Sequence, residues 1–441
     1  MIGNGSAYGV PGWGNNERQY YTNRASNVDV SNGTLKITAR RENFGGQAYT
    51  SARLRTMGSF EFKWGRIEAR MKLPSTSGVW PALWMLPTDS PYGGWASSGE
   101  IDIMESVNNA DRIYGTIHHG GNWPQNTATG NSIITGTDYS QSFHNYAVEW
   151  DPNEIRWYLD GVLFGTITSG QWFSSSATGN PRAPFDTPFH LLVNVAVGGN
   201  FPGDPNGSAQ YPQTLEVDYI RVLRREQRAF QGATRVLPGQ IEAEHYDEGY
   251  PGEAYFDIDV GNTGGALRND DVDLQPCSEG GQNIGWVNTG EWLEYTVDVQ
   301  TAGTYAVEAR VASPNNGGSF RIEVDGQDRT GPIPVQSTGG WQTWRTVEGQ
   351  LQLDAGPQTL RLHVVNSNAG FNINWLRFTR EGGCSSADLA EPFGTLNFFD
   401  LAAYMGQFTS QNPAADLAAP FGQFNFFDVA AYLGVFNAGC P

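Results

Sequence analysis

Three acidic residues stand close together in the segment Gly99–Ser106, which reads GEIDIMES. Alternation along a strand places Glu100 and Asp102 on one face and Glu105 on the other, unless a β-bulge absorbs one residue and returns Glu105 to the acidic face. Acids that share a face suit hydrolysis of a glycosidic bond with retention of configuration, because one carboxylate can attack the anomeric carbon while another gives and later takes a proton. The intervening Asp102 would hold the nucleophile by a hydrogen bond and keep the two outer pKa values apart.

The spacing alone allows a second interpretation, in which the acids form only the solvated face of a structural strand. The neighbouring residues favour chemistry, because tryptophans flank the acids and the flat C–H faces of sugar rings stack on aromatic rings. Trp80, Trp84 and Trp95 precede the acids, and the segment 115–124 that follows them contains His118. Either Trp80 or Trp84 can instead be a core residue. His118 can instead be a buried histidine bonded to backbone.

The elements that must position these residues are short strands. Segments such as 34–39, 59–64, 66–71 and 154–159 mostly alternate apolar and polar residues and are separated by Gly, Pro, Asn and Asp. This pattern indicates strands with one face packed on a core. We therefore expect residues 1–225 to form a sandwich of two large antiparallel sheets.

The rest of the chain divides into two further parts. Residues 236–380 are again rich in strand patterns, at a size usual for one smaller β-sandwich. Residues 384–441 contain a repeat with an offset of 28, in which 15 of 21 positions are identical between 388–408 and 416–436. Apolar residues at helical spacing follow an Asn-Phe-Phe-Asp start in each copy, which predicts two short helices packed as a pair. The fold class is therefore all-β with a short α-helical C-terminal repeat.

Charge and cysteine content narrow the partners and the location. The net charge of −19 argues against nucleic acid or an anionic membrane as partner, whereas a neutral ligand would not be repelled. No run of 18 or more apolar residues occurs, so we expect no membrane insertion. The first residues lack a charged and apolar leader, so an export signal was cleaved, trimmed or never present. Cys384 and Cys440 could close the last segment as a disulfide, which would leave Cys277 unpaired.

The acidic motif and its neighbours resemble glycoside hydrolase family 16, and the resemblance covers residues 1 to about 225. The extra Met104 matches the bulged motif of the laminarinase-like endo-β-1,3-glucanases in this family. Red-algal galactan hydrolases share the bulge, whereas bacterial lichenases have the form that is one residue shorter. The other segments that look like the laminarinase branch are Trp13–Glu17, Gln19–Thr22, Tyr49–Arg53, Gly115–Pro124 and Asn194–Asn200.

The resemblance implies a β-jelly-roll with Glu100 as nucleophile, Asp102 as its assistant and Glu105 as acid/base, without a catalytic cofactor. Asp218 matches a position that often binds a structural Ca²⁺ through hard oxygen ligands. The family's usual opening strand, which supplies another calcium ligand, is absent before Gly3, so we expect an exposed sheet edge and an incomplete metal site. The residues expected to line the cleft are Arg53, Trp80, Trp84, Trp95 and His118.

Residues 236–380 are similar to family 6 carbohydrate-binding modules. In such modules, loop aromatics and an asparagine of the last strand hold the sugar, and we predict Trp341 and Asn374 for these roles, with Trp344 as the alternative to Trp341. Trp292, Trp344 and Trp375 can instead be core residues. The segments that carry the similarity are Ile241–Tyr246, Gly285–Trp292, Gly340–Trp344 and Phe371–Trp375.

The same resemblance implies that Glu242 and Glu244 bind a structural Ca²⁺. Leu267 stands where these modules often carry a second stacking aromatic, which bears on the strength of binding. No acidic cluster like GEIDIMES recurs in this part of the sequence with similar aromatic flanks, so we expect this module to bind sugar without catalysis.

The C-terminal repeat resembles a dockerin, the duplicated calcium loop and helix that anchors enzymes to larger assemblies. An EF-hand-like loop needs carboxylates or amides at its third and fifth positions, but these are Ala390 and Pro392 in one copy and Ala418 and Pro420 in the other. We therefore expect the repeat to bind no calcium. A hydrophobic helix pair that acts as a surface tether is the preferred interpretation, and docking to a cell surface or scaffold is the alternative.

The sequence as a whole predicts a secreted or cell-surface endo-hydrolase that cuts β-1,3-glucan of the laminarin type, with an accessory module that keeps it near its polysaccharide. One alternative is another specificity of the same family, such as mixed-linkage glucan or a galactan. A second is a glucan-binding protein without catalysis, against which the presence of both Glu100 and Glu105 argues.

Overall fold

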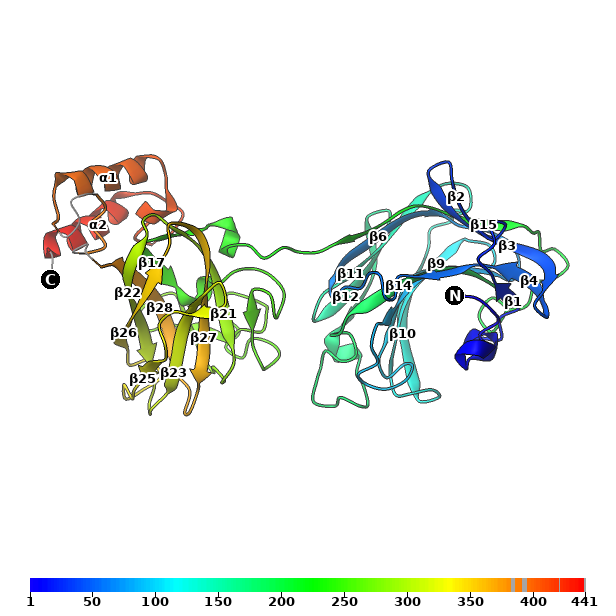
Figure 1. Ribbon diagram of the computed structural model, residues 1–441, viewed down its shortest axis with the longest axis horizontal. Helices are drawn as coiled ribbons and strands as arrows, with labels where there is room; N and C mark the ends of the chain where they lie inside the picture. The colour runs from blue at the N-terminus through cyan, green and yellow to red at the C-terminus, as the bar shows by residue number, and fades with distance from the viewer. Residues whose placement is uncertain (382–384, 391–394, 420, 440–441) are drawn as a thin grey trace. The chain divides into compact units, whose positions relative to one another are not determined.

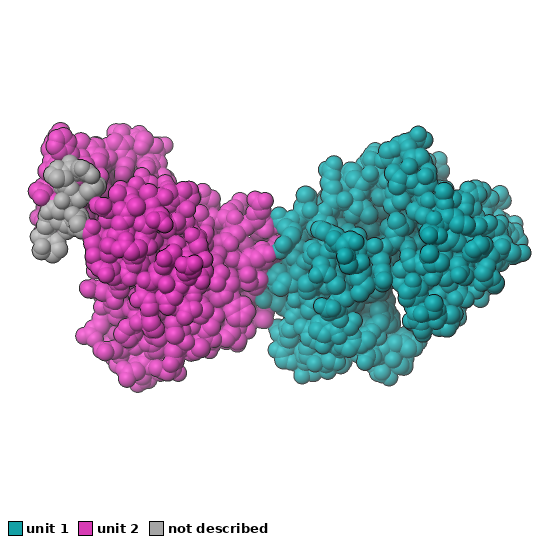
Figure 2. Space-filling view, viewed as in Figure 1, with its two compact units in different colours: residues 1–224 teal, residues 225–441 magenta. Residues whose placement is uncertain are grey.

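The computed structural model in Figure 1 describes residues 1–381, 385–390, 395–419 and 421–439. The chain forms two compact units, Met1–Arg224 and Arg225–Pro441 (Figure 2). Each unit is built mainly from β-strands, and the second also contains two α-helices near its end, as the sequence predicts. None of the helices in the described ranges is long and apolar enough to cross a membrane.

The first unit is a jelly roll of two facing sheets, and all of its residues are described. Sheet I has the spatial order β1 (Gln19–Tyr21), β4 (Gln47–Ser51), β3 (Thr34–Phe44), β15 (Gln213–Leu223), β6 (Gly65–Lys72), β11 (His144–Trp150), β12 (Glu154–Leu159) and β13 (Val162–Thr168), with β2 (Val28–Ser31) beside β3. Sheet II has the order β10 (Asn126–Ile134), β9 (Arg112–Gly120), β8 (Glu100–Glu105), β7 (Val79–Pro87), β14 (Phe189–Val197) and β5 (Arg53–Arg55). Short 3₁₀ helices lie at Ser6–Tyr8, Pro11–Gly14 and Ser169–Gln171.

Alternation decides which face of each strand is buried. In β6, Ile67 and Ala69 are fully buried between the sheets, while Arg66 and Glu68 point to the outer surface and form an ion pair. The core between the sheets is therefore filled from both sides by every second residue. Sheet II presents its other face as the surface on which the acidic motif lies.

Strand β8 carries the bulge on which the acidic motif depends. Its pairing with β9 shifts between Asp102 and Glu105, so that Ile103 and Met104 together stand opposite the single residue Gly115. Both bulged residues are buried. One extra residue is absorbed in this way, and Glu105 returns to the face of the other two acids.

Trp157 of sheet I holds this bulge from the core side. Its Nε1–H donates to the carbonyl oxygen of Asp102 at 2.8 Å. The indole ring lies against Gly115, where a Cβ atom would sit 2.3 Å from a ring carbon. A side chain at position 115 would therefore displace the indole that fixes the backbone of the acidic strand.

The second unit contains a smaller sandwich, and its described residues form two sheets. One sheet has the order β16 (Arg235–Leu237), β21 (Trp292–Val299), β27 (Gly356–Asn366), β23 (Gly318–Val324) and β24 (Gln327–Asp328), with β18 (Tyr255–Phe256) beside β21 and β25 (Ile333–Val335) beside β23. The other has β19 (Leu274–Pro276), β20 (Gln282–Ile284), β28 (Asn372–Arg380), β22 (Gly303–Ala312) and β26 (Arg345–Leu353), with β17 (Gly239–Glu242) beside β28. Short 3₁₀ helices lie at Phe230–Gly232 and Ala243–His245.

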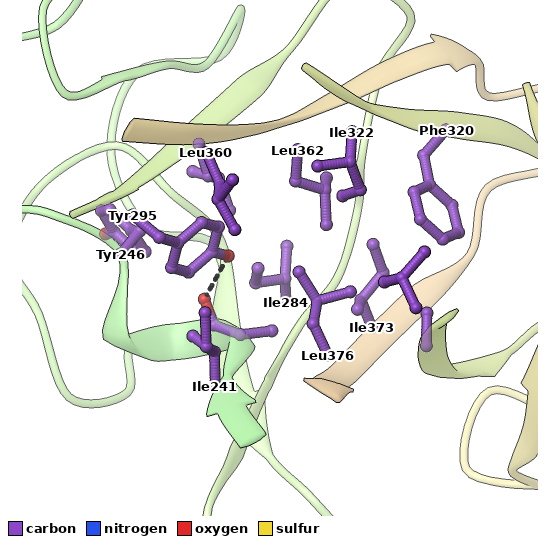
Figure 3. Close-up of a cluster of buried hydrophobic side chains, with 14 of the residues drawn as sticks. Ile241, Tyr246, Ile284, Tyr295, Phe320, Ile322, Leu360, Leu362, Ile373 and Leu376 are labelled. Carbon is purple, nitrogen blue, oxygen red and sulfur yellow. Dashed lines mark hydrogen bonds between the residues drawn. The ribbon is translucent and has the colours of Figure 1, made fainter. Parts of the chain in front are cut away.

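Aliphatic and aromatic side chains from both sheets fill the core of this sandwich. Figure 3 shows Ile322 and Leu362 of one sheet facing Ile373 and Leu376 of the other. Tyr295 is also fully inside, and its hydroxyl donates to the carbonyl oxygen of Ala243 at 2.9 Å. The one polar atom of this buried ring is thus satisfied by backbone.

The C-terminal repeat folds as the predicted pair of helices, α1 (Phe398–Thr409) and α2 (Phe426–Ala438), with a 3₁₀ turn at Pro413–Ala415. Tyr404 of α1 and Tyr432 of α2 stack with ring centroids 3.9 Å apart and planes 6° from parallel. Both rings are buried, so the two copies of the repeat share one small core.

Two expectations concern covalent closure and sheet edges. Cys384 and Cys440 lie outside the described residues, and Cys277 is a free, half-buried thiol. In sheet I, β15 pairs with β3 only up to Val217, and its residues 219–223 have β6 as their sole strand partner within the fully described first unit.

Candidate active site

The bulge places the three acids side by side on sheet II, where two tryptophans hold the outer carboxylates. The Nε1–H of Trp95 donates to Oε2 of Glu100 at 2.7 Å, and the Nε1–H of Trp80 donates to Oε1 of Glu105 at 3.0 Å. Asp102 lies between them and is 3% exposed. The outer carboxylates therefore have separate hydrogen-bond donors, as two groups with different tasks require.

His118 belongs to this cluster and not to the core. It pairs with Glu100 across β8 and β9, and its Nε2 lies 3.4 Å from Oδ2 of Asp102 and 3.8 Å from Oε1 of Glu100. Its ring centroid is 5.2 Å from that of Trp95. The imidazole thus supplies a positive charge between Asp102 and Glu100 when it is protonated.

Burial and mutual repulsion decide the protonation of the cluster. Burial, followed by repulsion from Asp102, raises the pKa of Glu100 to about 8. Burial and repulsion from Asp102 and Glu100 raise the pKa of Glu105 well above its usual range. Burial disfavours the cation at His118, but its contacts with Asp102 and Glu100 outweigh this effect and raise its pKa to about 9. Burial and the two neighbouring acids thus favour the protonated form of Glu105, which is the form a general acid needs.

The tryptophan hydrogen bonds make a pH-dependent prediction. Trp95→Phe removes a donor that stabilises the Glu100 carboxylate, so the pKa of Glu100 should rise and the acid limb of kcat/KM should move up by about 0.5 to 1 on the pH scale. Trp80→Phe removes the donor to Glu105, so the pKa of Glu105 should rise and the alkaline limb should move up instead. Full pH profiles of kcat/KM for both variants check this, and two variants with the same limb displaced would contradict the separate roles.

Further aromatic side chains extend from both ends of the acidic cluster. Trp123 is 71% exposed, its ring centroid lies 6.3 Å from that of Trp95, and its backbone N–H donates to the Trp95 carbonyl at 2.8 Å. On the side of Glu105, the exposed Phe201 contacts Trp80 edge to face with centroids 5.4 Å apart. Neither Trp123 nor Phe201 is among the predicted cleft residues, although Trp123 lies within the motif segment Gly115–Pro124 and Phe201 directly follows the segment Asn194–Asn200.

Arg53 and Trp84 lie on the strands beyond β8. Arg53 is 8% exposed, and its guanidinium sits between two indole rings, 4.5 Å from the centroid of Trp84 and 4.7 Å from that of Trp13. The Nε1–H of Trp84 donates to Oδ1 of Asn194 at 2.8 Å. Arg53 is therefore fixed by stacking and presents a rigid donor group on the same side of sheet II as the acids.

The cluster also has the composition of a metal site. Ligand atoms of Glu100, Asp102 and His118 all lie within 4.8 Å of one another. Acid–base and covalent chemistry by carboxylates needs no metal, however, so the absence of a catalytic cofactor stays a prediction.

In the second unit, Trp341 and Trp286 expose their rings near one asparagine. Trp341 is 46% exposed, Trp286 is 47% exposed, and Asn372 donates through Nδ2 to the Trp341 carbonyl at 2.7 Å. A Cβ atom on Gly285, next to Trp286, would sit 2.9 Å from Oδ1 of Asn372. Asn372 is thus close to the backbone of both exposed tryptophan segments.

The other predicted residues of this module lie differently. Asn374 is 4% exposed, and its Nδ2 donates to Glu279 at 3.4 Å. Trp344 is half-buried with its Nε1–H bonded to Ser278, so Trp341 is the more accessible of the two alternatives. Leu267 is 53% exposed at the predicted position without an aromatic ring. The remaining candidates, Trp292 and Trp375, are half-buried beneath Arg361 and Arg377.

The predicted calcium ligands fall into two unlike environments. Asp218 forms an ion pair with Arg70 at 2.6 Å, and its side chain is 38% exposed, so its calcium role stays a prediction. Glu244 accepts from the backbone N–H of Gln282 at 2.9 Å through Oε1. Its Oε2 and the side-chain oxygen of Gln282 are buried and without hydrogen-bond partners among the described residues. Two neighbouring oxygens that lack donors fit a hard cation.

A jelly roll whose open sheet face carries a pair of separately held carboxylates has the features of a retaining glycoside hydrolase. Residues 15–221 match glycosyl hydrolases family 16, and residues 266–380 match carbohydrate binding module (family 6). The chain belongs to glycosyl hydrolases family 16.

Two curated relatives and one solved structure illustrate the similarity. The chain is 45% identical over 227 residues to glucan endo-1,3-beta-glucosidase A1 of Niallia circulans, and the match covers 49% of this chain but only 33% of that protein. It is also 45% identical over 227 residues to a beta-glucanase of Rhodothermus marinus, where the match covers 49% of this chain and 77% of that protein. The crystal structure of the laminarinase catalytic domain from Thermotoga maritima MSB8 is 42% identical, covers 51% of this chain and 90% of that chain, and has a TM-score of 0.45.

Proposed function

We propose that this chain is an endo-acting hydrolase of β-1,3-glucan that works by retention of configuration. The observation that carries the proposal is the bulge in β8, which puts Glu105 on the face of Glu100 while each carboxylate keeps its own tryptophan donor. The names of the two relatives support glucan as the substrate class, and one of these names states a 1,3-linkage.

The residues then divide the reaction into two displacements. Glu100 attacks the anomeric carbon and forms a glycosyl-enzyme ester, while Glu105 gives its proton to the departing glucan oxygen. Glu105 next takes a proton from water, and the resulting hydroxide displaces Glu100 from the sugar. Asp102 and protonated His118 position Glu100 and balance its charge between the two steps.

A substrate panel tests the proposal. We expect the protein to release reducing ends from laminarin faster than from lichenan, agarose or carrageenan, with oligosaccharides of several lengths as early products. Preferred cleavage of lichenan or of a galactan would replace the proposed specificity by another within the family. Release from no substrate, together with retention on an insoluble β-1,3-glucan, would favour a glucan-binding protein without catalysis.

We propose that the second sandwich binds the same glucan through Trp341, helped by Trp286, with Asn374 as the predicted polar contact. In a Glu100→Ala background, which prevents hydrolysis, Trp341→Ala should weaken binding to insoluble β-1,3-glucan by about tenfold, because a stacking surface is lost. Depletion from solution measures the affinity. Trp375→Phe, a change at a half-buried ring, serves as the control, and an unchanged affinity in Trp341→Ala would contradict the assignment.

We also propose a structural Ca²⁺ at Glu242 and Glu244 of this sandwich, supported by the oxygens of Glu244 and Gln282 that lack donors. A bound ion would tie the start of the module to its loops and stabilise the folded state by mass action. Dialysis against EDTA should therefore lower the Tm of the second unit by a few degrees, and Ca²⁺ should restore it. Glu244→Gln should lose this response, while Glu308→Gln, at a partly exposed position of β22, should keep it. Equal responses in both variants would place the ion elsewhere.

The C-terminal repeat is proposed to be a dockerin-like pair that has exchanged calcium for direct packing. Asp400 accepts the backbone N–H groups of Leu389, Ala390 and Asn397, and Asp428 makes the matching three bonds in the second copy. These carboxylates satisfy backbone donors where an EF-hand would bind metal. The exposed pairs Phe398–Phe399 and Phe426–Phe427 offer an apolar surface for a tether to a cell surface or scaffold.

We further propose that the protein acts outside the cell or at its surface, because a polymeric glucan is reached there. Comparison of the culture supernatant and the cell surface of a producing strain, with and without residues 385–441, tests both location and tether. Equal release into the supernatant by both forms would argue against the tether.

A further inference from the structure

A serine, a histidine and an aspartate form a chain of hydrogen bonds where strand β11 begins. Oγ of Ser142 lies 2.9 Å from Nε2 of His144, and Nδ1 of His144 lies 2.7 Å from Oδ2 of Asp160. Asp160 comes from the turn between β12 and β13, and β12 pairs with β11 in sheet I (Figure 1). The sheet thus joins a hydroxyl, an imidazole and a carboxylate in the order that serine acyl-transfer enzymes use.

The backbone of β11 holds Asp160 in place. The backbone N–H of Asp160 donates to the carbonyl oxygen of Asn145 at 2.8 Å. In return, the backbone N–H of Asn145 donates to Oδ1 of Asp160 at 2.8 Å. The carboxylate therefore has a fixed orientation, and its other oxygen, Oδ2, faces His144.

This carboxylate also fixes the tautomer of His144. An ionised carboxylate only accepts hydrogen bonds, so Nδ1 of the neutral imidazole must carry the proton that it donates to Asp160. Nε2 is then an acceptor, and the hydroxyl of Ser142 is its donor. The ring of His144 also packs edge to face on the buried Tyr139, with centroids 5.0 Å apart and planes at 85°. The imidazole is thus positioned to take the proton of the serine.

Ser142 is accessible and lies beside two unused backbone donors. Its side chain is exposed, whereas that of His144 is 15% exposed. The backbone N–H groups of Ser142 and Phe143 have no hydrogen-bond acceptor within the first unit, which is described in full. Backbone N–H groups at and next to a nucleophile are donors that stabilise the oxyanion of a tetrahedral intermediate.

We propose that Ser142 and His144, positioned by Asp160, form a second catalytic site that hydrolyses uncharged esters with a short acyl group, such as acetyl esters. Oγ of Ser142 attacks the carbonyl carbon while Nε2 of His144 takes its proton. The bond to the alcohol oxygen then breaks, the alcohol leaves with the proton from His144, and an acyl-serine remains. Water gives a proton to His144 and attacks this ester, and Ser142 leaves with that proton as the carboxylic acid is released.

The surroundings of Ser142 set the class of ester. Because Ser142 is exposed, a long acyl chain would remain largely in water and would gain little from burial. The net charge of −19 disfavours anionic esters. The site belongs to sheet I, whereas Glu100 and Glu105 lie on the open face of sheet II, so this activity is independent of the proposed glucan hydrolysis.

Labelling with diisopropyl fluorophosphate tests the nucleophile on the full, unmodified chain. The bond between phosphorus and Oγ of an activated serine forms as fluoride leaves, and other serines react poorly. We expect one phosphoryl group per chain, located at Ser142 by peptide mass spectrometry and absent from Ser142→Ala. Ser140→Ala is the matched control, because Oγ of Ser140 donates to Asp138 at 2.6 Å and not to a histidine, and it should keep the label.

Hydrolysis of p-nitrophenyl acetate tests turnover. In a Cys277→Ser background, which removes a free thiol that also reacts with activated esters, Ser142→Ala and His144→Ala should each lower the rate at least about tenfold. Asp160→Asn should lower kcat to a similar extent with KM unchanged, because the imidazole loses its fixed tautomer, and Asp160→Glu should recover part of kcat. p-Nitrophenyl octanoate should be no better a substrate than the acetate. Unchanged hydrolysis of laminarin verifies that each variant is folded.

Three results would overturn the proposal. Absence of a label at Ser142 in the unmodified protein would show that its hydroxyl is not activated. Equal rates on p-nitrophenyl acetate before and after Ser142→Ala would show that esters react elsewhere on the chain. A rate on the octanoate more than about tenfold above that on the acetate would refute the preference for short acyl groups.

Discussion

Glu100→Ala is expected to reduce glucan hydrolysis by on the order of 10⁴-fold or more, with the fold and glucan binding retained. Without this carboxylate, no glycosyl-enzyme ester can form, and the strand itself remains because β8 is held by backbone pairing and by Trp157. Reducing-sugar release from laminarin measures the loss. Thermal unfolding and binding to insoluble glucan verify that only turnover has changed.

Two controls make this result specific. Glu216→Ala removes an acid on sheet I that is 3.7 Å from Lys72, and it should leave the rate unchanged. Anomeric analysis of the first products by NMR should give retained configuration for the unmodified protein. Inversion, or activity of Glu100→Ala near that of the unmodified protein, would refute the assignment of Glu100 as nucleophile.

Glu105→Ala is expected to lower the rate on glucan by about 10²–10⁴-fold, and the loss should depend on the leaving group. A sugar oxygen must be protonated as it departs, whereas a dinitrophenolate departs without a proton. Formation of the glycosyl-enzyme from a dinitrophenyl glycoside of laminaribiose should therefore be nearly unaffected, as shown by a burst of phenolate. Stopped-flow absorbance measures this burst.

Azide provides the second readout for Glu105. Once the Glu105 carboxylate is absent, azide can attack the glycosyl-enzyme without general-base help and should restore turnover with a β-glycosyl azide as product. The same treatment of Glu100→Ala should yield the α-azide, because azide then enters from the side of the missing nucleophile. The same azide anomer from both variants would contradict the distinct roles of Glu100 and Glu105.

Much of the fold was predictable, because apolar and polar residues that alternate in the sequence point to opposite faces of a sheet. In β6, the apolar residues Ile67 and Ala69 are the buried ones, and the two predicted repeat helices bury Tyr404 and Tyr432 from their apolar faces. The sequence of the acidic motif allowed two conformations. In a regular strand, the extra Met104 would place Glu105 on the face opposite Glu100 and Asp102, whereas a bulge would return it to their face. The decision between them depends on Trp157, which is 53 residues further along the chain than Met104 and reaches β8 only through the packing of the two sheets.

The accessory site was harder to predict, because it depends on loop paths. Trp286 is exposed on a backbone of φ 48°, a left-handed conformation that alternation does not predict. Trp286 lies within the segment Gly285–Trp292, which carries part of the family resemblance. The family pattern, however, places the second sugar-stacking ring at the position that Leu267 occupies here. Asp218 illustrates a similar limit, since the structure pairs it with Arg70 of another strand, a contact that alternation does not predict.

The bulge at Ile103–Met104 has an evolutionary consequence. Without Met104, the strand would be regular, and Glu100, Asp102 and the last glutamate would still alternate onto one face. The three acids therefore share a face with or without the extra residue, because the bulge absorbs that residue when it is present. Loss or gain of this one codon would change the slant of the last carboxylate without removing it. Descendants could thereby explore new glycosidic linkages through a viable intermediate.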